Sequence, residues 1–175
     1  MRKDPATRRV ARSILVNADP ERALRAFLDP EQMKRWWGAA RGLVEERKGG
    51  VWALAWGGEE GKGYRTAVSG VLKSFHPGKR ILLEPLVYFN PERSVLGPMR
   101  LSISVRNQGG RTRVTVRQDG FREGPDWDWY YEAVNHGWKE SLLHLKEFLE
   151  GPRPDDDGRS TSLGTSPPAS ARSVT

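Results

Sequence analysis

The sequence predicts an α+β domain in which a curved antiparallel sheet wraps around one long C-terminal helix. Three observations support this prediction. Apolar residues recur at helical spacing through residues 126–150, the middle of the chain alternates between apolar and polar residues at strand spacing, and two helix-start signals follow the first strand. A long apolar stripe needs a large apolar partner, and a sheet with one apolar face supplies it.

The longest predicted element is the final helix, residues 126–150. Its apolar residues are three or four positions apart and therefore share one face. Tyr130 flanks this stripe, whereas Trp129 falls on the far side, where we interpret it as a contact surface or as a residue before the first full turn. The members of the stripe are Trp127, Tyr131, Val134, Trp138, Leu142, Leu145 and Leu149.

Two short helices are predicted directly after the first strand. Asp19-Pro20-Glu21 and Asp29-Pro30-Glu31 each place a capping aspartate before a proline that fits the first helical position, with a glutamate near the positive end of the helix dipole. We expect helices at residues 20–28 and 30–36. In the pair Trp36-Trp37, one ring should be buried under the long helix and the other should lie nearer the mouth of a pocket.

Strand spacing predicts an antiparallel sheet of about six or seven strands. In the last hairpin, branched apolar residues face the helix and arginines face outward, which gives the sheet one apolar and one basic face. The basic face lacks the aromatic residues that stack on single-stranded nucleic acid, so we interpret it as a solvated surface or a contact for an acidic protein. It comprises Arg100, Arg106, Arg111, Arg113 and Arg117. The expected strands are residues 10–17, 42–47, 51–56, 64–75, 80–89, 99–107 and 111–118.

Composition limits the function. The 175 residues fit one domain, expected at 9–150, with a basic arm at 1–8 and a Ser/Thr/Pro-rich disordered tail at 151–175. The net charge is +7, of which residues 1–12 carry +4, five basic residues against one acidic residue. Since cysteine is absent, disulfides, thiol catalysis and iron–sulfur clusters are excluded. No apolar run approaches the roughly 18 residues of a membrane span, so we expect a cytoplasmic protein.

The candidate site is a pocket between the sheet and the long helix. Ligand pockets are mostly apolar, with a few polar groups that orient the ligand. Tyr88, Gln118, Tyr130 and Tyr131 are the candidate polar anchors. The alternative is that the seven tryptophans and other bulky rings fill this space, leaving a solid core. The expected ligand-binding residues are Trp52, Leu54, Trp56, Tyr88, Leu101, Ile103, Val116, Gln118, Tyr131, Val134 and Trp138.

Other chemical sites receive less support. His136, Glu140 and His144 have helical metal-ligand spacing, but they lie opposite the apolar stripe and therefore toward solvent. Glu84 lies in an apolar strand, where burial in the pocket would raise its pKa and make it an acid or base; we expect it to point outward or to pair with an arginine such as Arg80. We expect no cofactor, no metal and no catalytic residue.

The order of these elements resembles the helix-grip fold of the START-like, birch-pollen-allergen-like superfamily, also called SRPBCC. Specific motifs resemble the family named for activators of the heat-shock protein 90 ATPase. They are Arg12–Phe27, Asp29-Pro30-Glu31 with Trp36-Trp37, Gly49-Gly50-Val51-Trp52, Gly70-Val71-Leu72 ahead of Arg80-Ile81, Gln118 with Gly120-Phe121, and Gly137-Trp138 with the leucines that follow.

The resemblance implies a hydrophobic cavity between helix and sheet. We expect a non-enzymatic domain that binds a small hydrophobic or amphipathic ligand. Two alternatives stay open: a protein-interaction domain that activates a chaperone ATPase, and an enzyme of cyclase or hydratase type, because one fold can host many functions. The expected partners are a small apolar ligand and a chaperone or other protein, with no nucleic acid and no membrane span.

Overall fold

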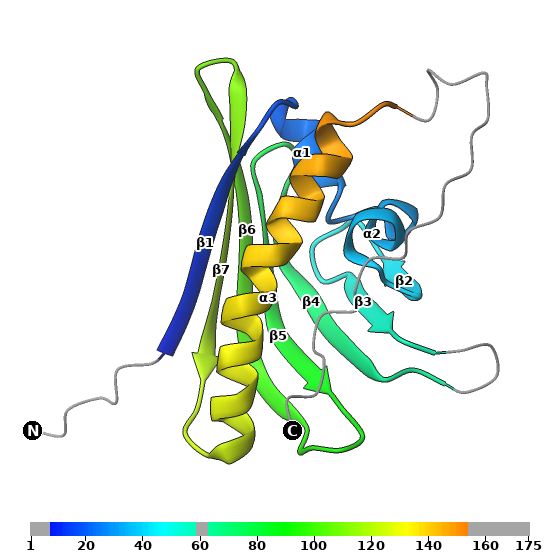
Figure 1. The fold of residues 1–175 in the computed structure, drawn as a ribbon, viewed down its shortest axis with the longest axis vertical. Helices are drawn as coiled ribbons and strands as arrows, with labels where there is room; N and C mark the ends of the chain where they lie inside the picture. Colours follow the sequence, from blue (N-terminus) through cyan, green and yellow to red (C-terminus); the bar gives the residue numbers. More distant parts are fainter. Residues whose placement is uncertain (1–7, 59–62, 154–175) are drawn as a thin grey trace, which may run out of the picture.

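The computed structural model describes residues 8–58 and 63–153. Most of the expected arm at 1–8 and tail at 151–175 lies outside these ranges. The described chain forms one seven-stranded antiparallel sheet in the order β1-β7-β6-β5-β4-β3-β2, which curves around the long helix α3 (Figure 1). This arrangement confirms the predicted α+β helix-grip class. The strands are β1 Arg8–Val16, β2 Arg41–Val44, β3 Val51–Trp56, β4 Thr66–His76, β5 Arg80–Phe89, β6 Leu96–Gln108 and β7 Arg111–Phe121.

The two short helices, α1 (Pro20–Arg25) and α2 (Pro30–Trp37), begin where the sequence predicts. Asp19 Oδ1 accepts a hydrogen bond from the backbone of Arg22 at 2.9 Å, and Asp29 caps α2 in the same way. α1 ends earlier than expected because the chain tightens after Arg25, where Phe27 and Leu28 donate to the carbonyls three residues before them. Together the two helices close one end of the sheet.

The long helix α3 spans Pro125–Glu150, and its C-terminal half is fixed to the start of the chain. Lys146 Nζ donates to the carbonyl of Leu15 at 3.0 Å, and Arg22 donates to the carbonyl of Leu149 at 2.7 Å. Trp138, Leu142, Leu145 and Leu149 are buried there, as the stripe predicts. This half of the helix therefore packs directly on the sheet and forms the closed end of the core.

The N-terminal half of α3 departs from the predicted stripe. Tyr130 is buried, whereas Trp127 and Tyr131 are only half-buried. Both of these contact Phe121 at the end of β7, with the Tyr131 ring 5.2 Å from it. Tyr130 lies between Phe121, at 6.0 Å, and Tyr88 of β5, at 4.4 Å, so the helix face that carries Tyr130 points toward β5.

A bulge in β5 sets which residues face the helix. Ile81 and Leu83 are buried, and the pairing register with β6 then shifts between Leu83 and Leu86. After the shift Leu86 and Tyr88 are the buried residues. Strict alternation from Ile81 would turn Tyr88 outward, so the extra residue is what brings Tyr88 beneath α3.

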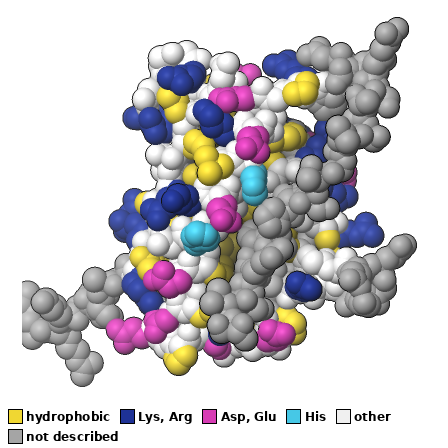
Figure 2. Space-filling view, in the orientation of Figure 1, with side chains coloured by type: hydrophobic (Ala, Val, Ile, Leu, Met, Phe, Trp, Pro, Cys, Tyr) yellow, Lys and Arg dark blue, Asp and Glu magenta, His cyan; other side chains and the backbone are white. Residues whose placement is uncertain are grey.

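The surface differs between the two sides of the molecule. Figure 2 shows side chains of both charges on the side that carries α3. On the outer face of the sheet, Arg106 and Arg113 lie directly opposite each other on β6 and β7, so like charges share the predicted basic face. None of the described helices is long and apolar enough to cross a membrane.

Candidate functional site

A cavity of about 120 Å³ lies between α3, the end of α2 and the central strands. Its size approaches the engineered cavity of about 150 Å³ in another protein that stays dry and binds benzene. The core is therefore not filled completely by its aromatic rings. The lining residues are Trp37, Trp52, Trp56, Thr66, Val68, Leu86, Tyr88, Leu101, Gln118, Trp129, Tyr130, Ala133, Val134, Gly137 and Trp138.

Seven of the predicted ligand-binding residues line this cavity: Trp52, Trp56, Tyr88, Leu101, Gln118, Val134 and Trp138. Four do not. Ile103 and Val116 pair across β6 and β7 and are fully buried in the core. Leu54 of β3 is buried against Gly42 of β2, near the start of α2. Tyr131 turns to the other flank of α3, where its hydroxyl lies 3.4 Å from the carbonyl of Arg9.

Part of the lining was not predicted from the sequence, most clearly the small residues Ala133 and Gly137, one turn apart on α3. A Cβ placed on Gly137 would meet no atom within 4 Å, so this glycine borders open space. The sequence signal for them was the presence of small residues among the large aromatic residues of this helix. Small side chains leave space unfilled that a larger side chain would occupy. Trp37 lines the cavity and Trp36 is 2% exposed, as predicted for one pocket ring and one buried ring. The ring that contacts α3 is Trp37, 5.0 Å from Trp138, whereas Trp36 donates to the carbonyl of Ala26.

Hydrogen bonds hold the tryptophan walls in place. The indole N–H of Trp52 donates to the carbonyl of Phe27 at 2.8 Å, and that of Trp56 donates to the carbonyl of Trp37 at 3.1 Å. A buried indole needs such an acceptor. With their N–H groups occupied by the backbone near α1 and α2, these rings present apolar surface to the cavity in a fixed orientation.

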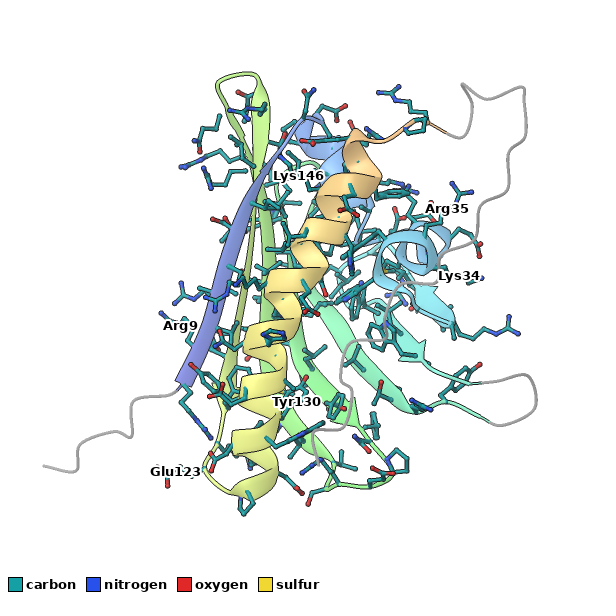
Figure 3. The ribbon with its side chains drawn as sticks, viewed as in Figure 1. Arg9, Lys34, Arg35, Glu123, Tyr130 and Lys146 are labelled. Carbon is teal, nitrogen blue, oxygen red and sulfur yellow. The ribbon has the colours of Figure 1, made fainter. Side chains whose placement is uncertain are left out.

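The polar part of the cavity is a chain of three side chains. Trp138 Nε1 donates to Gln118 Oε1 at 3.3 Å, and Gln118 Nε2 donates to the hydroxyl of Tyr130 at 3.4 Å. Gln118 is 3% exposed, and Tyr130 projects from α3 toward the sheet (Figure 3). Burial raises the pKa of Tyr130 well above its ordinary value, so its hydroxyl stays neutral.

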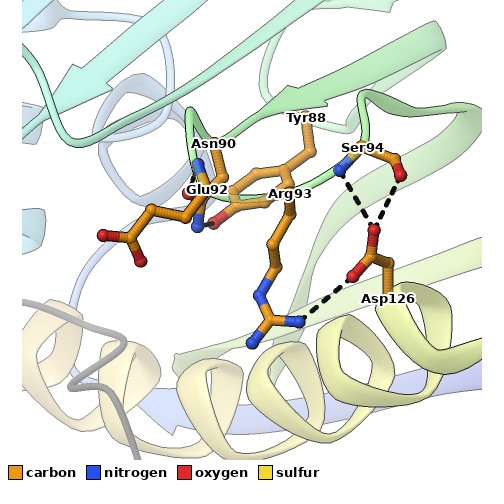
Figure 4. Close-up of polar contacts among 6 residues, drawn as sticks. All are labelled: Tyr88, Asn90, Glu92, Arg93, Ser94 and Asp126. Atoms are coloured by element: carbon orange, nitrogen blue, oxygen red, sulfur yellow. Dashed lines mark hydrogen bonds and ion pairs between the residues drawn. The ribbon is translucent and has the colours of Figure 1, made fainter.

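The loop between β5 and β6 is tied to the first turn of α3. Asp126 accepts hydrogen bonds from the hydroxyl of Ser94 at 2.7 Å and its backbone N–H at 3.0 Å, and Arg93 pairs with the same carboxylate at 3.2 Å (Figure 4). These contacts, led by the Ser94 hydroxyl, lower the pKa of Asp126. The Arg93 guanidinium also lies 3.8 Å from the ring centroid of Trp129. The prediction that Trp129 faces away from the core is wrong: it is a cavity wall supported from behind by Arg93.

Glu84 points away from the cavity and pairs with an arginine, as expected, and that arginine is Arg100 where Arg80 was the example given. Its carboxylate accepts from Lys73 at 2.9 Å and from Arg100 at 3.1 Å. These hydrogen bonds, Lys73 first, lower its pKa. On α3, His136 pairs with Glu140 at 3.1 Å on the exposed face. Within residues 8–58 and 63–153, no group of three acidic or histidine side chains is arranged to hold a metal ion.

The fold and the cavity together define a helix-grip domain with an aromatic-lined pocket between the sheet and α3. Residues 17–150 match the model of the family described as activator of Hsp90 ATPase homolog 1-like protein, and the chain belongs to this family. No curated protein matches the chain by sequence.

Solved structures share the fold at low identity. A protein from Rhizobium leguminosarum superimposes with a TM-score of 0.66 at 17% identity, covering 82% of this chain and 95% of that one. MLL2253 from Mesorhizobium loti gives 0.65 at 18% identity, with 82% and 97% coverage. The Aha1 dimer from Colwellia psychrerythraea gives 0.61 at 17% identity, with 82% and 96% coverage.

Proposed function

We propose that this protein is a non-enzymatic binding domain for a small hydrophobic or amphipathic molecule. The observation that supports the proposal is the cavity of about 120 Å³ beneath α3, with fixed aromatic walls and a buried polar chain at Gln118. An apolar space with few polar groups is the usual form of a small-molecule site. The ligand would be held by burial of its apolar body and oriented by hydrogen bonds.

The lining favours binding over catalysis. Among the described residues around the cavity there is no carboxylate, imidazole or amine. General acid–base catalysis needs a group that gains or loses a proton near the working pH. Glu84, the carboxylate considered for this role, lies outside the cavity in ion pairs with Lys73 and Arg100. The lining tyrosines have raised pKa values because burial disfavours their charged form.

The test is to identify what the full chain carries when it is purified from its own host. The bound material would be extracted and analysed by mass spectrometry for the wild type and two helix variants. Ala133→Phe places a ring in the cavity, whereas Leu143→Phe adds one on the outside of α3, where Leu143 is 52% exposed. We expect one compound in near-stoichiometric amount with the wild type and with Leu143→Phe, and none with Ala133→Phe. The same compound in equal amount on all three proteins, or no compound on the wild type, would contradict the proposal.

A second candidate function follows from the family and from the basic outer sheet face. The family description names an activator of the Hsp90 ATPase, and this chain would do the same by contacting the chaperone. Such contact would use the outer surface, so a filled cavity should not affect it. The discriminating assay is the ATPase rate of the host's Hsp90 with and without the protein. Stimulation that Ala133→Phe leaves unchanged would favour the chaperone role over ligand binding.

A further inference from the structure

The hydrogen bonds around the cavity have a fixed direction. An indole N–H can only donate, so the atom of Gln118 that faces Trp138 must be its carbonyl oxygen. The amide nitrogen of Gln118 is thereby turned toward the Tyr130 hydroxyl and toward Met99 Sδ, 3.5 Å away. Since an amide nitrogen only donates, the Tyr130 oxygen is the acceptor. The hydroxyl proton of Tyr130 is left over, and no described residue accepts it.

The hydroxyl of a second tyrosine, Tyr88, also accepts a hydrogen bond while its own proton has no acceptor among the described residues. The backbone N–H of Glu92 donates to Asn90 Oδ1 at 3.0 Å, which fixes the orientation of the Asn90 amide. Asn90 Nδ2 then donates to the Tyr88 hydroxyl at 3.3 Å (Figure 4). Within the described chain, the Tyr88 proton also has no acceptor. The ring centroids of Tyr88 and Tyr130 lie 4.4 Å apart and both residues line the cavity, so two unused donors border the same space.

We propose that the cavity selects an uncharged, ring-sized ligand that carries a hydrogen-bond acceptor, such as a carbonyl or ether oxygen, directed at Tyr88 and Tyr130. This inference rests on the proposed binding function and names the chemical class of its ligand. A buried donor without a partner is unfavourable, and an acceptor on the ligand removes that cost. A ligand that only donates would leave both hydroxyl protons unsatisfied.

The charge of the lining and the volume of the cavity further limit the class of ligand. The described lining contains no lysine or arginine, and Arg93 lies on Trp129 while it is paired with Asp126. The Arg93 charge acts on the Tyr88 hydroxyl but is already offset by Asp126, so an anionic group would find no unpaired cation in the described lining, which is unfavourable. Both tyrosines have raised pKa values and so keep their protons available for donation. The volume of about 120 Å³ admits one ring with a small substituent.

The experiment compares two probes of the same shape on the full chain. Acetophenone carries a carbonyl oxygen, and α-methylstyrene has a methylene group in its place. Binding would be followed by NMR through the indole N–H signals, because five tryptophans line the cavity. Each probe would be titrated into the wild type, Tyr130→Phe, Tyr88→Phe and the control Tyr131→Phe, whose hydroxyl lies outside the cavity.

We expect Tyr130→Phe and Tyr88→Phe each to weaken acetophenone binding by about three- to tenfold, the size of one neutral hydrogen bond. Binding of α-methylstyrene should not weaken, and Tyr131→Phe should change neither probe. Tyr88→Phe removes no hydrogen bond of Gln118. If Tyr130→Phe disturbs folding, the comparison of the two probes therefore relies on Tyr88→Phe. Equal effects on both probes would overturn the acceptor inference while leaving the binding function in place. Failure of both probes to bind the wild type would instead overturn the binding function itself.

Discussion

Replacing Gly137 by alanine should stabilise the protein, because glycine is unfavourable inside α3 and the cavity leaves space for an added methyl group. It lies in the interior of a 26-residue helix, where glycine is roughly 1 kcal/mol less favourable than alanine. In a packed core the added methyl group would clash and offset this gain. At Gly137 an added Cβ meets no atom within 4 Å, so the helical gain should appear in full.

The expected increase in the free energy of unfolding for Gly137→Ala is therefore about 1 kcal/mol, or roughly 2–4 °C in melting temperature for a domain of this size. Gly120→Ala is the matched control. Gly120 has a φ of 95°, and its added Cβ would lie 3.1 Å from Met99 Cα. Alanine is strained in that conformation, so this variant should lose about 1–2 kcal/mol.

The assay is urea unfolding of the wild type and both variants at one pH. The three curves are fitted with one common m-value, the slope of the unfolding free energy against urea concentration. A stability gain for Gly137→Ala and a loss for Gly120→Ala would support the open space beside α3. A loss for Gly137→Ala would mean that neighbouring side chains already occupy that space, and the reasoning that leads to a cavity would fail.

Three further predictions concern the contacts around the cavity. Trp52→Phe removes the indole bond to the carbonyl of Phe27 and should cost about 2–3 kcal/mol in urea unfolding; a loss near zero would show that this bond does not hold the wall. The lowered pKa of Glu84 means that its ion pairs stabilise the fold above its unfolded pKa and stop doing so as the pH falls through the lowered value. Glu84→Gln should thus be less stable than the wild type at pH 7, by less than about 1 kcal/mol, and equal to it in acid, as thermal melts across pH would measure. Asp126→Asn should speed hydrogen exchange at the Ser94 amide, whereas unchanged exchange would mean that the loop is held by other contacts.

The long helix and most strands were predictable because their patterns are local. Residues 51–56 and 80–89 form β3 and β5 with the predicted bounds, since apolar runs ending at turns define them. The caps at Asp19 and Asp29 were predictable for the same reason, because a cap involves only neighbouring residues. The fold class followed from the order of these elements.

The cavity was only partly predictable because it depends on contacts between distant residues. Helical periodicity placed Tyr131 on the inner face, but its hydroxyl lies by the carbonyl of Arg9 on the other flank, and Tyr130 is the buried residue. The β5 bulge that directs Tyr88 inward falls at Pro85, and a proline inside a strand is the local sign of a bulge that the alternation pattern alone did not use. The position of Trp129 depends on Arg93, which lies in a loop 36 residues earlier in the sequence. The choice among neighbouring aromatic residues is thus made by tertiary packing.

The central claim is that open apolar space exists between α3 and the sheet. Xenon binds apolar space of about this size, so diffraction from crystals of the full chain under xenon pressure tests the claim directly. We expect a xenon atom among Trp52, Leu101 and Trp138. Crystals that take up xenon elsewhere and show none between α3 and the sheet would contradict it.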